Sequence, residues 1–245
     1  MDEFEKILRW AWYIDYGETP EQSIEKIKNI FSPSCSPCHL STSHFHISLT
    51  EMLTQFRNDI LKQGQNHNID SRAIAGAIAW EYEENFVGRL SDYLQYNSFS
   101  SYRCKGTLFG QGLGWGSIHT DTAQKFRPHS RPFELQCLRL EAVSAIELVA
   151  EIMDDVAAQY YNLSGGIWIR DSPAVLALFF NTGEKLLSQS AAKHKLNLCK
   201  PNQVITLTIS QNQMATWVNA NLERFAEFKT PPIPPKENYA KIVVQ

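Results

Sequence analysis

The sequence predicts a mainly α-helical fold for this chain of 245 residues. Apolar residues recur at spacings of three and four along most of the chain, which is the period of one helix face. Several of these stretches begin with Ser or Thr followed by Pro, or by Glu or Gln three positions later, which is typical of helix starts. One short segment, QVITLTIS at residues 203–210, alternates like a β-strand, and one strand cannot form a sheet alone.

The composition is that of an ordinary globular protein, with 43% hydrophobic and 11% aromatic residues. The formal net charge is -3, and no long run of Lys or Arg marks a nucleic-acid-binding surface. No apolar stretch reaches the roughly 18 residues of a membrane span, and the N-terminus MDEFEKILRW mixes charges with apolar residues, unlike a signal peptide. We therefore expect a protein made in the cytoplasm, with no membrane insertion and no nucleic-acid partner.

Three helices are expected before residue 71. The first covers residues 4–14, where apolar residues follow helical spacing. The second begins at Thr19, which can cap it ahead of a proline in the first turn. A third opens at Ser48 with a capping box and runs to about Gly64. Residues 1–70 are therefore predicted to be an N-terminal helical extension.

The main domain is expected to span residues 71–230, followed by an extended tail at residues 231–245. Its longest apolar stripe, residues 132–161, predicts a central core helix. Ser and Pro at the start of SPAVLALFFN predict a second buried helix. Shorter helices are expected in SRAIAGAIAWEYEE at residues 71–84, in SIHTDTAQKF at 117–126 and through residues 214–225.

Glu81 lies at the edge of the apolar face of the helix that begins near Ser71. Spacings of three, four and seven put it on the same side as Ile74 and Ile78. Apolar neighbours and the like charge of Glu84, one turn later, both favour its protonated form. A carboxylic acid held protonated near neutral pH is what general-acid cleavage of a glycosidic bond requires. The alternative to a catalytic role is that Glu81, Glu83 and Glu84 simply mark a solvated helix end.

The motifs AIAWE, GWGSIHTDTA and VLALFFNTG follow one another along the chain. In this order they resemble three motifs of goose-type lysozymes and soluble lytic transglycosylases. AIAWE at residues 77–81 resembles the end of the helix that carries their catalytic glutamate. GWGSIHTDTA at 114–123 resembles their second motif, and VLALFFNTG at 175–183 their third. The resemblance covers residues 71–186 and implies a lysozyme-like helical domain.

The resemblance also implies roles for matched positions. It makes Glu81 the general acid, and it puts the glycine-rich strip that ends at Gly116 close to the sugar. Ser117 stands where the family has Gln, Thr120 replaces a proline, and Phe180 replaces a tyrosine. The candidate substrate-binding residues are Gln111, Gly114, Trp115, Ser117, His119 and Asn181.

A second carboxylate decides between two reactions. An inverting hydrolase needs one to activate water, whereas a lytic transglycosylase can use a single acid that later acts as base. Asp92 in LSDYLQ and Asp121 in HTDTA are the candidates, and each could equally be a helix cap or a surface charge. Hydrolysis and transglycosylation both stay open.

A separate cluster, Cys35, Cys38, His44 and His46, has the residue types of a structural zinc site. Unligated thiols in a loop, or one labile disulfide, are equally consistent with it. Five cysteines are an odd number, which argues against a disulfide framework. No cofactor is expected for catalysis.

The function implied by the resemblance is cleavage of peptidoglycan at the β-1,4 bond between N-acetylmuramic acid and N-acetylglucosamine. Because a wall-degrading enzyme without a signal peptide needs another route out, we expect an antibacterial toxin. A specialised machine such as type VI secretion would carry it into a target periplasm, and a cognate immunity protein would be its partner. Phage-type lysis is the competing route. A non-catalytic glycan-binding module and a zinc-stapled adaptor are the other functional classes.

Overall fold

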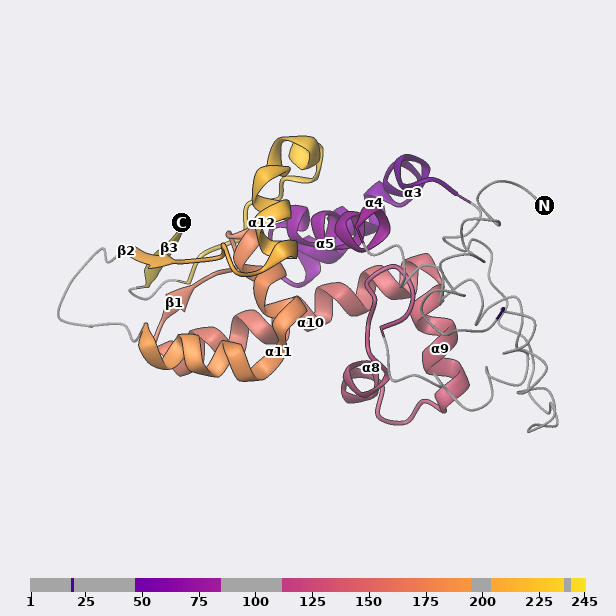
Figure 1. Ribbon diagram of the computed structural model, residues 1–245, viewed down its shortest axis with the longest axis horizontal. Helices are drawn as coiled ribbons and strands as arrows, with labels where there is room; N and C mark the ends of the chain where they lie inside the picture. Colours follow the sequence, from indigo (N-terminus) through magenta and orange to yellow (C-terminus); the bar gives the residue numbers. More distant parts are fainter. Residues whose placement is uncertain (1–18, 20–46, 85–111, 195–203, 236–238) are drawn as a thin grey trace. The chain divides into compact units, whose positions relative to one another are not determined.

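The computed structural model describes residues 19, 47–84, 112–194, 204–235 and 239–245 (Figure 1). Over these residues the protein is predominantly helical, which confirms the mainly α fold class. The expected helices at residues 4–14 and after Thr19 lie outside the described residues.

The chain divides into two compact units, and the divisions fall inside helices. Unit 1 contains Met1–Ser48 and Glu81–Ala145, and unit 2 contains Leu49–Trp80 and Ile146–Gln245. Helix α5, Ser71–Glu83, and helix α10, Ala142–Ser164, each pass from one unit to the other. The division differs from the domain boundary expected at residue 70.

The helix expected from Ser48 to about Gly64 is present in unit 2 as two successive helices. These are α3, Leu49–Gln55, and α4, Arg57–Asn66. Gly64 lets the end of α4 approach the start of α5 closely, because a Cβ at this position would lie 1.9 Å from the Ser71 Oγ.

The core of unit 2 is formed by apolar side chains of four helices. Besides α5 and α10 these are α11, Pro173–Lys193, and α12, Gln213–Ala220. Gly76 allows close packing here, since a Cβ in its place would lie 3.0 Å from the Val218 side chain. Buried members include Ile74, Ile78, Val149, Met153, Leu176, Phe179, Met214 and Val218.

Two of these helices differ in extent from the prediction. The helix expected in SPAVLALFFN is confirmed and continues as α11, although Gly183, with φ 73°, breaks its helical geometry. The helix expected through residue 225 is shorter: α12 ends at Ala220, and a 3₁₀ helix η1 follows at Leu222–Phe228. The Asn212 Oδ1 caps α12 by accepting a hydrogen bond from the Ala215 amide at 2.8 Å.

Unit 2 also contains a parallel three-stranded sheet in the order β1-β3-β2 (Figure 1). The strands are β1, Ile167–Trp168, β2, Val204–Leu207, and β3, Ala240–Val244. The expected strand in QVITLTIS is confirmed as β2. The end of the expected tail is instead the central strand, because β3 alternates buried and exposed residues and pairs with strands distant in the sequence.

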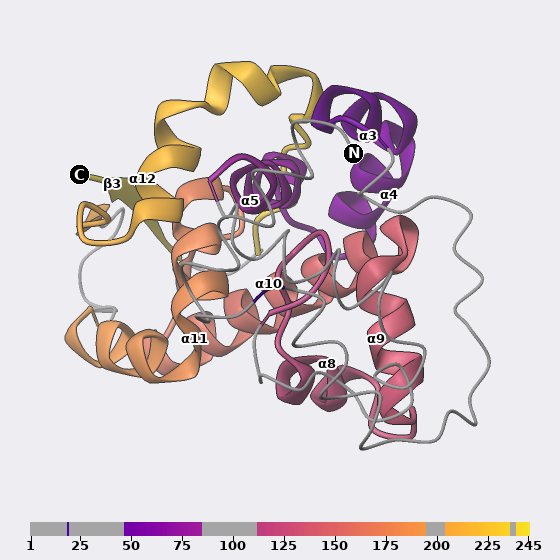
Figure 2. The same cartoon turned by 45° about the vertical axis from the view of Figure 1, so that its right-hand side comes forward.

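The described helices of unit 1 that follow α5 are α8, Thr120–Phe126, and α9, Pro132–Leu140, which pack against each other (Figure 2). A capping box opens α9, where the Glu134 carboxylate accepts from the Arg131 amide at 2.8 Å. Hydrogen bonds from Arg131 hold the pKa of the Glu134 carboxyl below its usual range.

The single long helix expected over residues 132–161 is wrong in one respect, because it is broken between α9 and α10. Glu141 leaves helical geometry, with ψ 127°, and its carboxylate caps α10. It accepts hydrogen bonds from the Val143 amide at 3.2 Å and the Ser144 amide at 2.7 Å. The apolar periodicity continues across this cap, so the pattern alone does not reveal it.

Cys137 in α9 is disulfide-bonded, and this bridge does not by itself make the disulfide framework that the odd number of cysteines argues against. The other four cysteines lie outside the described residues. Among the helices that the structure describes, none is long and apolar enough to cross a membrane.

Candidate active site

The three glutamates at the end of α5 differ in their burial. Glu81 is 7% exposed, whereas Glu83 and Glu84 are exposed to solvent. Ile74 and Ile78, which precede Glu81 on the same face, are fully buried. Since ionised carboxylates are rarely withdrawn from water without a reason, Glu81 is the carboxylate of this group that merits a functional explanation.

Aromatic stacking joins the end of α5 to the glycine-rich segment of unit 1. The rings of Tyr82 and Trp115 are stacked, with centroids 5.8 Å apart and planes inclined by 14°. The Tyr82 hydroxyl donates a hydrogen bond to the Ile47 carbonyl at 3.0 Å. Trp115 is 2% exposed, so it packs inside the unit and does not offer a ring face to a sugar. The candidate Trp115 is therefore a core residue of unit 1.

Residues 112–118 form a tight antiparallel turn. Leu113 and Ile118 exchange backbone hydrogen bonds, both at 3.1 Å. Gly114 has φ 78°, and a Cβ there would lie 1.8 Å from the Arg139 carbonyl oxygen. A Cβ on Gly112 would lie 1.9 Å from the Ser117 carbonyl oxygen. These two buried glycines therefore serve close packing within the protein, where sequence reasoning expected close approach to a sugar.

Arg139 attaches this turn to α9. It is fully buried, and its guanidinium donates to the Ile118 carbonyl at 2.8 Å and to the Leu135 carbonyl at 3.1 Å. Neither Arg139 nor Tyr82 is among the candidates predicted from the sequence. A basic residue inside the apolar pattern LQCLRL was the available signal for Arg139, because a fully buried Arg needs hydrogen-bond partners.

The polar candidates after the turn are more exposed than Glu81. Ser117 is half-buried, with φ 47°, and His119 is exposed at the position that precedes α8. Asp121 is exposed in the first turn of α8, where a negative charge stabilises the helix dipole. All three belong to unit 1, as Glu81 does.

Asn181 lies in unit 2, on α11. It is exposed, and its side-chain oxygen accepts a hydrogen bond from the Asn212 amide at 2.8 Å. Thus Asn181 supports the residue that caps α12.

The remaining candidates lie outside the described residues, and within those residues no group of three or more His, Cys, Asp or Glu side chains could hold a metal ion. The candidates outside are Asp92, Gln111, Cys35, Cys38, His44 and His46.

Tyr82, the residue after Glu81, thus stacks on the turn at residues 112–118, which Arg139 attaches to α9. Comparison with protein-family models, with curated proteins and with solved structures found no match for this chain. The likeness to goose-type lysozymes and lytic transglycosylases therefore rests on the three sequence motifs.

Proposed function

We propose that this protein is a lysozyme-like muramidase that cleaves the β-1,4 bond between N-acetylmuramic acid and N-acetylglucosamine, with Glu81 as general acid. The observation that carries the proposal is the burial of Glu81, which is 7% exposed at the end of an apolar helix. Its neighbours Glu83 and Glu84 have the same chemistry and are exposed. They serve as internal controls for a role that depends on burial.

The chemistry follows from the withdrawal of Glu81 from water. Desolvation disfavours the charged form of a carboxyl group, so it keeps a proton available near neutral pH. In glycosidic cleavage the acid transfers that proton to the leaving-group oxygen while positive charge develops on the sugar. An exposed glutamate would be ionised at the same pH and would have no proton to transfer.

The turn at residues 112–118 supports this role by its rigidity. Tyr82, the residue after Glu81, stacks on Trp115, and Arg139 holds the same turn against α9. A general acid acts efficiently only when its support is fixed to a fraction of an ångström. In this proposal, Tyr82 and Trp115 are positioning residues and do not contact substrate.

The products distinguish the two reactions in which Glu81 could act as general acid. Hydrolysis leaves reducing ends, whereas capture by the sugar's own 6-hydroxyl leaves 1,6-anhydro ends. Asp121 or Asp92 would supply the second carboxylate of an inverting hydrolase. Mass spectrometry of released muropeptides from wild type and from Asp121→Asn separates these outcomes, since loss of hydrolysis in this variant would assign Asp121 to water activation.

We further propose that the protein acts as an antibacterial toxin in a target periplasm, against which a cognate immunity protein protects the producer. The test is expression of the full chain in a bacterium, with and without an added export signal. Wild type should lyse cells only when exported, and exported Glu81→Gln should be harmless. If exported wild type is also harmless, although folded, the proposed function is wrong.

A further inference from the structure

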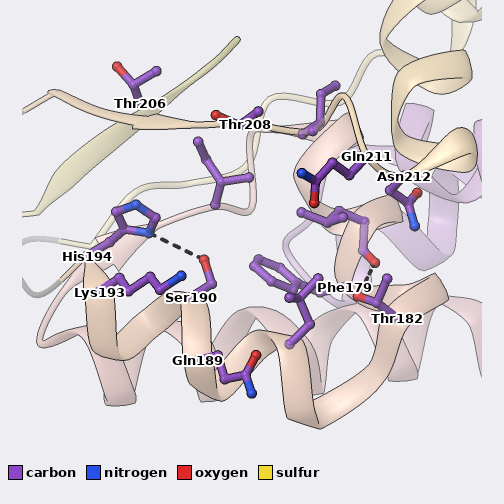
Figure 3. A pocket seen from close by; sticks show the side chains of 14 residues that line it. Phe179, Thr182, Gln189, Ser190, Lys193, His194, Thr206, Thr208, Gln211 and Asn212 are labelled. Carbon is purple, nitrogen blue, oxygen red and sulfur yellow. Dashed lines mark hydrogen bonds between the residues drawn. The ribbon is translucent and has the colours of Figure 1, made fainter.

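Unit 2 contains a pocket between α11, from Leu178 to its C-terminal end, and the segment that runs from β2 to α12 (Figure 3). Its volume is about 420 Å³, within the range of roughly 300–1,000 Å³ that holds small ligands. Every residue that lines it belongs to unit 2, so the pocket does not include Glu81.

One end of the pocket is basic. Lys193 and His194 are the ionisable side chains that line it, and no carboxylate is among the lining residues. Within the described part of the chain, Lys193 forms no ion pair or hydrogen bond with its side chain. The His194 Nδ1 lies 3.3 Å from the Ser190 hydroxyl and 3.4 Å from the Tyr160 hydroxyl, which orient the imidazole. This end can therefore receive one negative charge.

The rest of the pocket offers neutral hydrogen-bonding groups over an apolar floor. Thr206, Thr208 and Gln211 line the wall opposite α11 (Figure 3). Their side chains make no hydrogen bonds within the residues that the structure describes. The apolar lining includes the exposed Leu186, besides Phe179 and Leu207, which are buried. Amide groups and small apolar side chains of a ligand fit such a surface.

These features disfavour two other ligand classes. A phosphate carries more than one negative charge, whereas the lining contains one lysine and no arginine at the negative pole of α11, which suits a singly charged carboxylate better. A neutral sugar prefers an exposed aromatic face, whereas Phe179 is 0% exposed. A short peptide with a free carboxylate satisfies the basic end, the neutral wall and the apolar floor.

We propose that this pocket binds the acidic peptide that peptidoglycan carries on N-acetylmuramic acid, with a peptide carboxylate paired to Lys193. The inference rests on the proposed function, because that function supplies a substrate with such peptides. Thr206, Thr208 and Gln211 hydrogen-bond the peptide backbone, and its alanine methyl groups pack against Leu186, which lines the pocket and is 38% exposed. The pocket thereby selects glycan strands that still carry their peptides.

The test is calorimetric titration of the full chain with the free tetrapeptide L-alanyl-γ-D-glutamyl-meso-diaminopimelyl-D-alanine. Lys193→Gln should weaken binding about tenfold or more, as expected for loss of one charge-assisted hydrogen bond. The control is Lys185→Gln, an exposed lysine of the same helix that does not line the pocket, and it should bind within about twofold of wild type. Circular dichroism checks that both variants are folded.

Failure of the pocket and failure of the proposed function give different results. Glu81→Gln should bind the tetrapeptide as wild type does, even though it does not cleave glycan. If Glu81-dependent cleavage is observed but the tetrapeptide does not bind at millimolar concentration, or both lysine variants bind equally, the pocket inference is wrong and the enzyme proposal stands. Displacement of the peptide by inorganic phosphate or by a chitin tetramer would also overturn the inference. Lys193-dependent binding without any cleavage would support the pocket and contradict the enzyme proposal.

Discussion

Burial separates side chains that look alike in the sequence. Glu81 is withdrawn from water while Glu83 and Glu84 are exposed, so the proposed general acid is the buried one of three neighbouring carboxylates. The apolar spacing of α5 predicted that difference for Glu81. The burial of Trp115 had no such signal, because its place depends on Tyr82, which lies more than thirty positions earlier in the chain.

Gln136 in α9 provides a residue-scale prediction about stability. It is fully buried, and among the described residues neither atom of its side-chain amide has a hydrogen-bond partner. Such a group costs about 1–3 kcal/mol of desolvation. Gln136→Met keeps the size and removes that cost, so the free energy of unfolding should rise by about 1 kcal/mol in urea denaturation.

The matched control for Gln136 is Gln124. Its amide donates to the Arg127 carbonyl at 2.9 Å and to the Pro128 carbonyl at 3.0 Å after α8. Gln124→Met should therefore lower the free energy of unfolding by about 1 kcal/mol. Equal effects of the two substitutions would show that hydrogen bonding does not distinguish these positions.

Among the elements, the turn at residues 112–118 depends on contacts that local sequence does not reveal. Its glycines predicted a loop, and the structure confirms a turn there. What the sequence could not supply is the partner, because Arg139 and α9 come about twenty residues later. The sequence also does not reveal the break at Glu141. Its carboxylate can cap α10 only because α9 ends at the residue before it, and the apolar pattern does not show that end.

Two glycines with positive φ, one in this turn and one in α11, separate the cost of close packing from the cost of backbone strain. Gly114→Ala should cost more than about 2 kcal/mol of stability, since it combines an unfavourable φ with a Cβ only 1.8 Å from the Arg139 carbonyl. Gly183→Ala, at φ 73° with nothing within 4 Å of its Cβ, should cost about 1 kcal/mol. Thermal unfolding of both variants measures the difference, and equal losses would contradict the packing role of Gly114.

For the whole molecule, the main difference from the prediction is the sheet of unit 2. Local alternation was enough to predict β2, whereas β1 has two residues and β3 lies in a segment expected to be an extended tail. Strand pairing joins positions that are far apart in the chain, so periodicity can predict a strand but not its neighbours. Helices were predicted better because their hydrogen bonds are local.

The central place of β3 predicts that the C-terminus is needed for stability. Ile242 is 9% exposed and the adjacent Val243 is 51% exposed. Ile242→Asp should unfold or strongly destabilise unit 2 because it buries an unpaired carboxylate, and Val243→Asp should change stability by less than about 1 kcal/mol. Faster hydrogen exchange of the β2 amides would report the loss of stability, since β2 pairs with β3. Equal tolerance of both substitutions would mean that residues 240–244 are a dispensable tail.

The central claim is that burial makes Glu81 the general acid. The most direct measurement is the rate at which purified peptidoglycan releases soluble muropeptides with wild type, Glu81→Gln and the exposed control Glu84→Gln. The account predicts a loss of roughly 100-fold or more for Glu81→Gln and a rate within about twofold of wild type for Glu84→Gln. Release by Glu81→Gln at the wild-type rate, or equal losses in both variants, would contradict it.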